Sequence, residues 1–315
     1  MSLWTPFFAA AVSLPFLIGC GHLPPHGAYT PRRPPAEELR WEELHRAERA
    51  GRLEEALRGY SEMCSAPEPY SRACYDSTRV MFELGPLEAA RRRTAEFLLR
   101  FPDEALAPAA ARRLARSYVR SGEIDRGVEE IGRLIGKTEG GEVNDSLIYE
   151  LARLHREAGR REAEAEALDR IASRGRWQSQ LWDDSLWHLV EIRREQGDTR
   201  AEQRRLEQLL DAREESHLIG SYDSPYHDDA LLRLGELKRE RGDIEGALEA
   251  FDRLAGWETS GLRDDAMLEA ARLRLDQGRR EECCDLLEEL IEKMPESVGA
   301  REATELMERS GCPGE

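Results

Sequence analysis

Aromatic residues and lysine are scarce in this sequence, and β-branched runs are nearly absent. Only 7% of its 315 residues are Phe, Trp or Tyr, and lysine occurs only at Lys137, Lys238 and Lys293. Without β-branched runs a β-sheet would lack its usual material, whereas Ala, Leu, Glu and Arg, all good helix formers, dominate the chain. The low aromatic content suits a helical stack better than one thick globular core. We therefore expect an all-α protein.

Familiar catalytic motifs are also missing. The chain contains no G-x-S-x-G nucleophile elbow, no H-E-x-x-H metal motif, no Walker loop and no dinucleotide fingerprint. His217, Asp223, His227 and Asp228 cluster around one long loop, but their spacing matches no known type of metal site. We expect no enzyme activity, no metal and no dissociable cofactor.

The charge balance is strongly acidic, with 63 Asp and Glu against 46 Lys and Arg and a formal net charge of -17. Binding to nucleic acid depends on Lys and Arg, which displace counterions from phosphates. The balance therefore argues against a nucleic-acid partner and against broad adhesion to anionic lipid.

The clearest local pattern is a helical hairpin over residues 224–254. Apolar residues recur at helical spacing in two runs, and Gly242 with Asp243 interrupts them where the chain must reverse. Small residues stand at Gly235 and Ala247, where two helices would cross closely. The apolar positions are Leu231, Leu234, Leu237, Ile244, Leu248, Phe251 and Leu254.

The hairpin pattern repeats along the chain. Turn glycines occur at Gly51, Gly85, Gly122, Gly159, Gly197, Gly242 and Gly278, at intervals of 34, 37, 37, 38, 45 and 36 residues. A small residue and then a larger one follow most of these turns at a fixed offset, as in Ala56 and Tyr60, Ala90 and Thr94, Gly127 and Ile131, Ala247 and Phe251, and Cys283 and Leu287. The fourth and fifth units, with Ala163, Leu168, Ala201 and Leu206, match less well.

These units resemble tetratricopeptide repeats (TPRs). The resemblance implies a right-handed superhelical solenoid of about seven TPR-like helical hairpins over residues 36–311, closed by a capping helix near residues 298–309. Two connectors, which begin at Phe101-Pro102-Asp103 and Met294-Pro295-Glu296-Ser297, resemble those of bacterial envelope TPR lipoproteins, including the barrel-assembly lipoprotein and the Tol-Pal-associated coordinator. In these connectors we expect the Asp or Ser to cap the following helix.

The amino terminus carries an uncharged apolar run over residues 3–19 that ends in Leu17-Ile18-Gly19-Cys20. This tetrapeptide resembles a bacterial lipobox, which implies a signal peptide over residues 1–19 and a diacylglycerol and an acyl chain on Cys20. Residues 20–35 are rich in Pro and Gly and predict an extended tether. Gly21 after the lipidated residue implies the outer membrane, with the protein facing the periplasm. An ordinary signal peptide or an uncleaved anchor stays open as the alternative.

Five cysteines remain after Cys20, in a compartment where thiols tend to oxidise. Cys64 ends one predicted helix and Cys74 begins the next, so a disulfide could close the loop between them. The alternative is that both are small buried residues at helix crossings. Cys312 could reach back to either Cys283 or Cys284.

The inner face of the predicted solenoid is the candidate binding site. First-helix positions 2, 5, 9 and 12 of a TPR line the groove, and counting back from the turn glycines selects a mainly basic and aromatic set. Arg binds carboxylates bidentately and aromatic rings add rigid contact area, so this groove suits an acidic peptide or a C-terminal carboxylate. The competing interpretation is that these arginines pair with neighbouring Glu on their own helices. The set comprises Arg72, Tyr75, Arg79, Arg112, Arg116, Tyr149, Arg153, Arg156 and Trp187.

We therefore predict a lipid-anchored protein-interaction scaffold of the bacterial envelope that takes part in biogenesis or machinery assembly. Two alternatives remain: a cell-wall or division coordinator, and a subunit that recognises peptidoglycan or sugar through Trp and Tyr. Trp177, Trp182 and Trp187 are spaced by five and do not share one helical face. We expect at least one of them to pack between repeats.

Overall fold

The structure is a computed structural model that describes residues 35–138, 140–211 and 224–312. Within these ranges the chain forms fifteen α-helices and no β-strand, as expected. Cys20, the tether up to residue 34, His217 and Asp223 lie outside the described residues. The helices are α1 (Ala36–Arg49), α2 (Leu53–Ser65), α3 (Ser71–Leu84), α4 (Leu87–Arg100), α5 (Ala107–Ser121), α6 (Ile124–Ile135), α7 (Gly141–Glu157), α8 (Arg161–Ala172), α9 (Trp182–Glu195), α10 (Thr199–Asp211), α11 (His227–Glu240), α12 (Ile244–Ala255), α13 (Arg263–Asp276), α14 (Arg280–Lys293) and α15 (Val298–Ser310).

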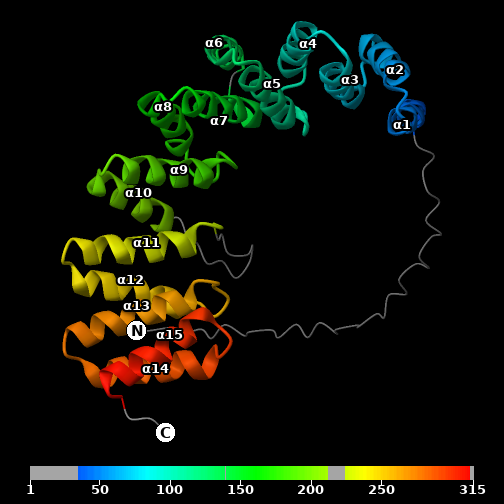
Figure 1. The fold of residues 1–315 in the computed structure, drawn as a ribbon. Coiled ribbons are helices and arrows are strands. Elements are labelled where there is room, and N and C mark those ends of the chain that lie inside the picture. The colour runs from blue at the N-terminus through cyan, green and yellow to red at the C-terminus, as the bar shows by residue number, and fades with distance from the viewer. Residues whose placement is uncertain (1–34, 139, 212–223, 313–315) are drawn as a thin grey trace, which may run out of the picture.

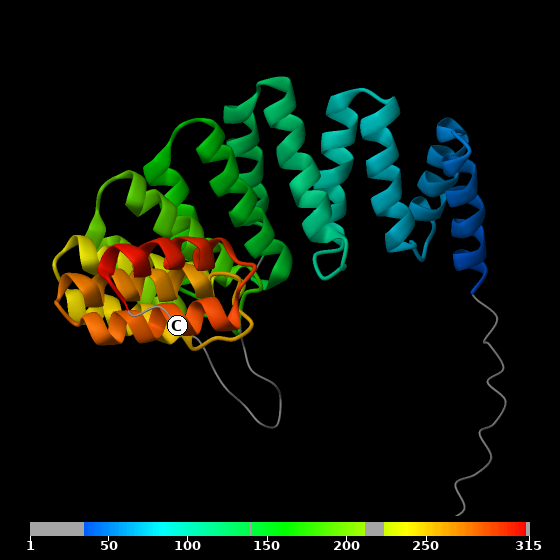
Figure 2. The same cartoon turned by 60° about the horizontal axis from the view of Figure 1, so that its bottom comes forward.

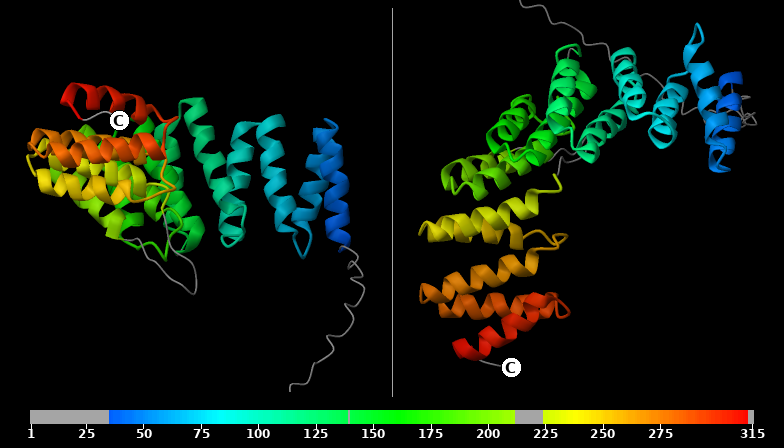
Figure 3. Two further views of the ribbon diagram at one scale, coloured as in Figure 1. Left: turned by 90° about the horizontal axis from the view of Figure 1, so that it is seen from below. Right: turned by 45° about the horizontal axis from the view of Figure 1, so that its top comes forward.

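The first fourteen described helices pair into seven hairpins, and α15 packs against α13 and α14 as the expected cap. The hairpins follow one another along a C-shaped arc, with α1 and α15 at its two ends (Figure 1). Along its first half, α4 and α6 lie on the outer edge and α5 and α7 on the inner edge. Figure 2 shows the helices of the first hairpins standing side by side, and Figure 3 shows α11 to α15 stacked in layers. None of the helices in the described ranges is long and apolar enough to span a membrane.

Six of the seven predicted turn glycines adopt the left-handed conformation, with φ between 69° and 78°. A residue with a Cβ is strained there, so glycine lets the first helix of each hairpin stop and reverse within two residues. Gly85 differs, since its φ is -109° and Pro86 follows it directly. The second hairpin therefore turns through an extended Gly-Pro pair.

Close helix crossings account for the small residues within the hairpins. A Cβ built on Gly235 would lie 2.4 Å from Cε1 of Phe251, whose ring occupies that space. Ala247 and Phe251 are both fully buried. The close helix crossing predicted at these small residues is confirmed.

The fourth and fifth hairpins depart from the predicted pattern. The small residue stands five positions after the turn glycine in the other hairpins, but here that position holds Glu164 and Glu202, not Ala163 and Ala201. Both carboxylates are buried, with exposures of 0% and 1%. Glu164 is paired with Arg156 at 2.6 Å and with Arg161 at 2.9 Å, while Arg233 reaches Glu202 at 2.6 Å. A buried charge is tolerated because a guanidinium compensates it.

The connectors agree in part with the capping prediction. The hydroxyl of Ser297 accepts a hydrogen bond from the Ala300 N–H at 3.0 Å and so caps α15. Asp103 does not cap α5, because that helix begins after Leu106 and has no side-chain cap.

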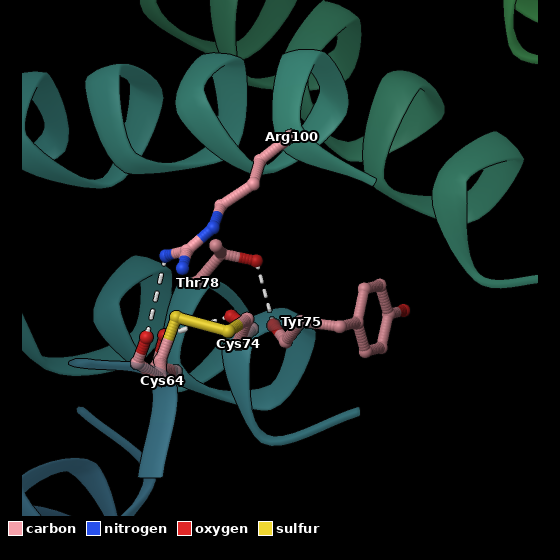
Figure 4. Close-up of a disulfide and its surroundings, with 6 residues drawn as sticks. Cys64, Cys74, Tyr75, Thr78 and Arg100 are labelled. Carbon is pink, nitrogen blue, oxygen red and sulfur yellow. Dashed lines mark hydrogen bonds between the residues drawn. A yellow bond between two sulfur atoms is a disulfide. The ribbon is translucent and has the colours of Figure 1, made fainter. Parts of the chain in front are cut away.

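Two disulfides close the ends of helices in the described chain. Cys64 at the end of α2 is bonded to Cys74 in α3, and Arg100 of α4 donates to the Cys64 carbonyl at 3.4 Å (Figure 4). Cys284 in α14 is bonded to Cys312 after α15, which leaves Cys283 as a buried free thiol. Cys283 fills the small core position of its hairpin, and this is why its neighbour makes the bridge.

Candidate functional site

The structure brings three of the nine predicted groove residues to one hollow. Arg79 of α3 and Arg112 and Arg116 of α5 line a cavity of about 650 Å³ between these two helices. Arg113 and Arg120, which the groove prediction missed, line it as well, while Glu83 is its carboxylate. We call this cavity the arginine hollow.

The composition of α5 makes the arginine hollow basic. The helix carries four arginines and no Asp or Glu, although acidic residues exceed basic ones in the whole chain. Arg112, Arg116 and Arg120 recur every four residues and therefore lie on one face of the helix. Like charges at this spacing destabilise a helix by a few tenths of a kcal/mol per pair. A bound anion would remove that repulsion.

The arginines of the hollow differ in how they are held. The Arg79 guanidinium is 3.1 Å from the Asp76 carboxylate and 2.5 Å from that of Glu48. Burial alone would raise the pKa of Glu48, but the hydrogen bond and charge of Arg79 outweigh it and lower the pKa. Arg79 is therefore a structural cation that joins α1 to α3.

Arg116 and Arg120 are exposed, and within the described residues neither makes a hydrogen bond or an ion pair to a side chain. Arg112 is held less tightly than Arg79, since its only ion pair within the described residues is a contact of 3.5 Å between its Nε and Oε1 of Glu150. Arg113 donates to the Tyr75 hydroxyl at 3.3 Å. The cations available to a partner are thus Arg116 and Arg120, in the later turns of α5. The absence of Asp and Glu from that helix is the sequence signal that identifies Arg120.

Five other predicted groove residues lie outside the arginine hollow and take part in packing or in ion pairs. The Arg72 guanidinium stacks over the Trp41 ring at 3.6 Å, and Tyr75 is buried against Phe97. Trp187 stacks on Tyr226, with ring centroids 5.3 Å apart. Arg153 pairs with Glu150 at 3.0 Å, and Arg156 pairs with buried Glu164. Arg153 shows the competing interpretation, a pair with Glu on its own helix, whereas the partner of Arg156 stands on the next helix, α8.

The ninth residue, Tyr149, lies in a second cavity of about 560 Å³ between α5, α7 and the α8–α9 connection. Arg112 lines both cavities and so joins them. We call the second cavity the tryptophan hollow, because Trp177 stands on its wall.

Burial sets the protonation chemistry of the tryptophan hollow. Glu150 is 3% exposed, and this burial raises its pKa, although the charges of Arg153 and Arg112 partly oppose the shift. Burial also raises the pKa of Tyr149 to about 12, and its hydroxyl is hydrogen-bonded to Nε2 of His188 at 2.8 Å. Tyr149 therefore stays neutral and acts as a hydrogen-bonding group.

The two described members of the suggested metal cluster have structural roles. The His227 ring is buried between the Leu209 carbonyl and the Ser224 N–H. Asp228 accepts a hydrogen bond from the Ser260 hydroxyl. Across the described ranges no three His, Cys, Asp or Glu side chains are grouped to hold a metal ion.

Comparison with known proteins agrees with the fold. The sequence profile of the tetratricopeptide repeat matches residues 229–256 and 265–297. No curated protein matches the chain. The C-terminal part of a TPR repeat-containing protein from Cytophaga hutchinsonii is similar in structure, with a TM-score of 0.50 and 8% identity over 84% of this chain and 98% of that chain. PilF of Pseudomonas aeruginosa has a TM-score of 0.43 and 15% identity over 75% of this chain and 97% of its own.

Identities this low show the fold alone. The two matched segments coincide with the hairpins α11–α12 and α13–α14, and four of the five hairpins before them share the left-handed glycine turn. The described chain is therefore an all-α solenoid of TPR-like hairpins, and its sixth and seventh hairpins are tetratricopeptide repeats, a module of protein–protein interaction scaffolds.

Proposed function

We propose that this protein is a lipid-anchored scaffold of the bacterial envelope that holds a protein partner by an acidic segment in the arginine hollow. The observation that carries the proposal is the face of α5, where Arg112, Arg116 and Arg120 stand in a row without a carboxylate on the same helix. Solenoids of this kind bind partners on extended surfaces that successive repeats build together.

The chemistry of the hollow favours carboxylates over other groups. A guanidinium offers a planar fork that matches a carboxylate with two hydrogen bonds. Phe82 and Leu87 also line the hollow and supply an apolar wall for neighbouring side chains. The net charge of -17 repels an acidic segment from most of the surface, so a local basic patch also guides where that segment docks.

The proposed location rests on two features. Leu17-Ile18-Gly19-Cys20 supplies the lipidation motif, and we propose Cys20 as the site of the diacylglycerol and acyl chains. Disulfides at Cys64–Cys74 and Cys284–Cys312 support an oxidising compartment such as the periplasm. We propose the outer membrane as the anchoring membrane, with the solenoid facing the periplasm.

The partner site is tested by crosslinking and mass spectrometry in cells. In the double variant Arg116→Glu and Arg120→Glu, crosslinks to the partner should be lost, because two exposed cations become anions. The matched control is Arg253→Glu with Arg301→Glu, which reverses two exposed arginines on α12 and α15. Full recovery of every partner by the first variant would refute the site. The partner recovered decides the process: an outer-membrane assembly component supports biogenesis, and a cell-wall synthase supports the coordinator alternative.

The anchor is tested separately. Cys20→Ser should abolish incorporation of radiolabelled palmitate and release the protein into the soluble fraction. Labelling that persists in this variant would exclude Cys20 as the lipidated residue.

A further inference from the structure

Trp177 stands out among the described side chains because it is 66% exposed. The Arg176 guanidinium lies 5.0 Å from the centroid of this ring, and most of the indole surface is still exposed, although burial of such a ring would normally stabilise a fold or an interface. Trp182, only five residues later, is 4% exposed and packs in the core. The expectation that at least one of these tryptophans packs between repeats is met by Trp182, which leaves the exposure of Trp177 to be explained.

The backbone around Trp177 is held in place. Trp182 donates its indole N–H to the Ala172 carbonyl at 3.0 Å, and this bond ties the start of α9 to the end of α8. Gly175 turns the chain with φ at 90°, and the Gln178 N–H donates to its carbonyl at 3.1 Å. Trp177 is thus presented on a short braced connection, which lowers the entropy lost when a ligand binds.

The tryptophan hollow beside this ring offers donors and acceptors in mixture. Its volume of about 560 Å³ lies within the range of small-molecule sites, roughly 300–1,000 Å³. Tyr149 and Ser146 bring hydroxyls from α7, and the Gln178 and Gln180 amides come from the connection itself. Glu150 adds a buried carboxylate at the wall.

The charges in this hollow nearly cancel. The basic side chains are Arg112 and Arg176, and the acidic ones are Glu142, Asp145 and Glu150. Asp145 is neutralised by Arg174, and Glu150 by Arg153. Neither a strong anion nor a strong cation is selected, in contrast to the arginine hollow. The combination fits a neutral ligand with many hydroxyl groups and one apolar face.

We propose that the tryptophan hollow binds a short saccharide of neutral pyranose units, with the C–H face of one sugar ring against Trp177. Such a ring has an apolar face that covers an indole. Its hydroxyls would form hydrogen bonds with the Gln178 and Gln180 amides, the Tyr149 hydroxyl and the Glu150 carboxylate. This site does not depend on the arginine hollow, although Arg112 lines both. A partner segment and a glycan can therefore occupy neighbouring cavities on either side of Arg112.

The test is calorimetric titration of the purified full chain with two probes, the trimer of N-acetylglucosamine and the trimer of glucose. At least one should bind at millimolar concentration or below. Trp177→Ala should weaken binding at least about tenfold, the factor that corresponds to about 1.4 kcal/mol. Trp177→Phe should restore most of the affinity, because a phenyl ring still stacks.

The controls separate this site from surface effects and from the partner site. Val298→Ala removes another large apolar side chain that is 62% exposed and should leave the affinity unchanged. The variant Arg116→Glu with Arg120→Glu should also bind the sugar normally, even though it loses the protein partner. The proposal is overturned when neither trimer binds at millimolar concentration, or when Trp177→Ala binds as tightly as the original chain while circular dichroism shows both folded.

Discussion

Replacing Arg233 in the Glu202–Arg233 pair should cost far more stability than replacing Glu202. Nε of Arg233 lies 2.6 Å from Oε1 of Glu202, and Nη2 lies 3.4 Å from Oε2. Glu202 is 1% exposed, and within the described chain Arg233 is the only side chain that pairs with it. Arg233 has two further carboxylates, Glu236 at 3.0 Å and Glu240 at 3.1 Å. The two partners are therefore unequally dependent on each other.

The magnitudes follow from what each variant leaves buried. Arg233→Met keeps an apolar stem of similar length but leaves a carboxylate in the core without a cation, at a cost of about 3–5 kcal/mol. Glu202→Ala installs the residue that Ala247 supplies one hairpin later, and Arg233 stays neutralised by Glu236 and Glu240. Its cost should be about 1–2 kcal/mol. The double variant buries no charge and should be more stable than Arg233→Met alone.

The assay is urea unfolding followed by far-ultraviolet circular dichroism, with hydrogen exchange of α10 and α11 as the local measurement. A solenoid can open one part at a time, so the exchange rates report the pair more directly than a global midpoint. Glu202→Ala should be the most stable of the three variants, with the double variant close to it or next in order. Arg233→Met should be the least stable. Equal losses in the two single variants, or a double variant as unstable as Arg233→Met, would refute the reasoning.

Three shorter predictions concern other parts of the stack. Gly235→Ala should destabilise the sixth hairpin by about 1–3 kcal/mol, because the new Cβ would meet Phe251 at 2.4 Å; thermal unfolding measures the loss, and an unchanged midpoint would contradict it. Replacing Cys64 and Cys74 together by Ala should cost about 2–4 kcal/mol in urea unfolding, and no loss would show that the bridge does not constrain the unfolded chain. Burial raises the pKa of Glu150 above its usual 4.5, so the folded state holds that proton more tightly than the unfolded state, and stability should fall as pH rises through the raised pKa. Glu150→Gln should remove this decrease, and an identical pH profile would count against it.

Most of the fold could be predicted from local sequence patterns, because each hairpin is formed by about forty consecutive residues. The glycine spacing predicted seven reversals, six of which are left-handed turns, and the small residues predicted close crossings such as the one at Gly235. Gly85 was harder to read, since the proline after it selects an extended turn that spacing alone does not reveal.

The interactions between hairpins were predicted less well. Glu164 and Glu202 look like surface residues in a helical pattern, and each is buried against an arginine of a neighbouring helix that the pattern does not reveal. For the same reason, a register that selects inner-face arginines cannot tell a committed one such as Arg156 from an exposed one such as Arg116. The partner on the next helix decides that difference, because Arg156 has Glu164 of α8 at 2.6 Å, whereas within the described residues Arg116 pairs with no carboxylate.

The Glu202–Arg233 pair also affects how a chain of similar units finds its correct order. Similar hairpins can stack on one another in several arrangements, and misassembly is a characteristic failure of repeat proteins. If the sixth hairpin were looped out and the seventh packed in its place, the residue nine positions before the turn glycine would be Glu269 where Arg233 now stands. Two carboxylates would then face each other in the core. The buried charge of Glu202 thus favours packing against the sixth hairpin and disfavours packing against the seventh.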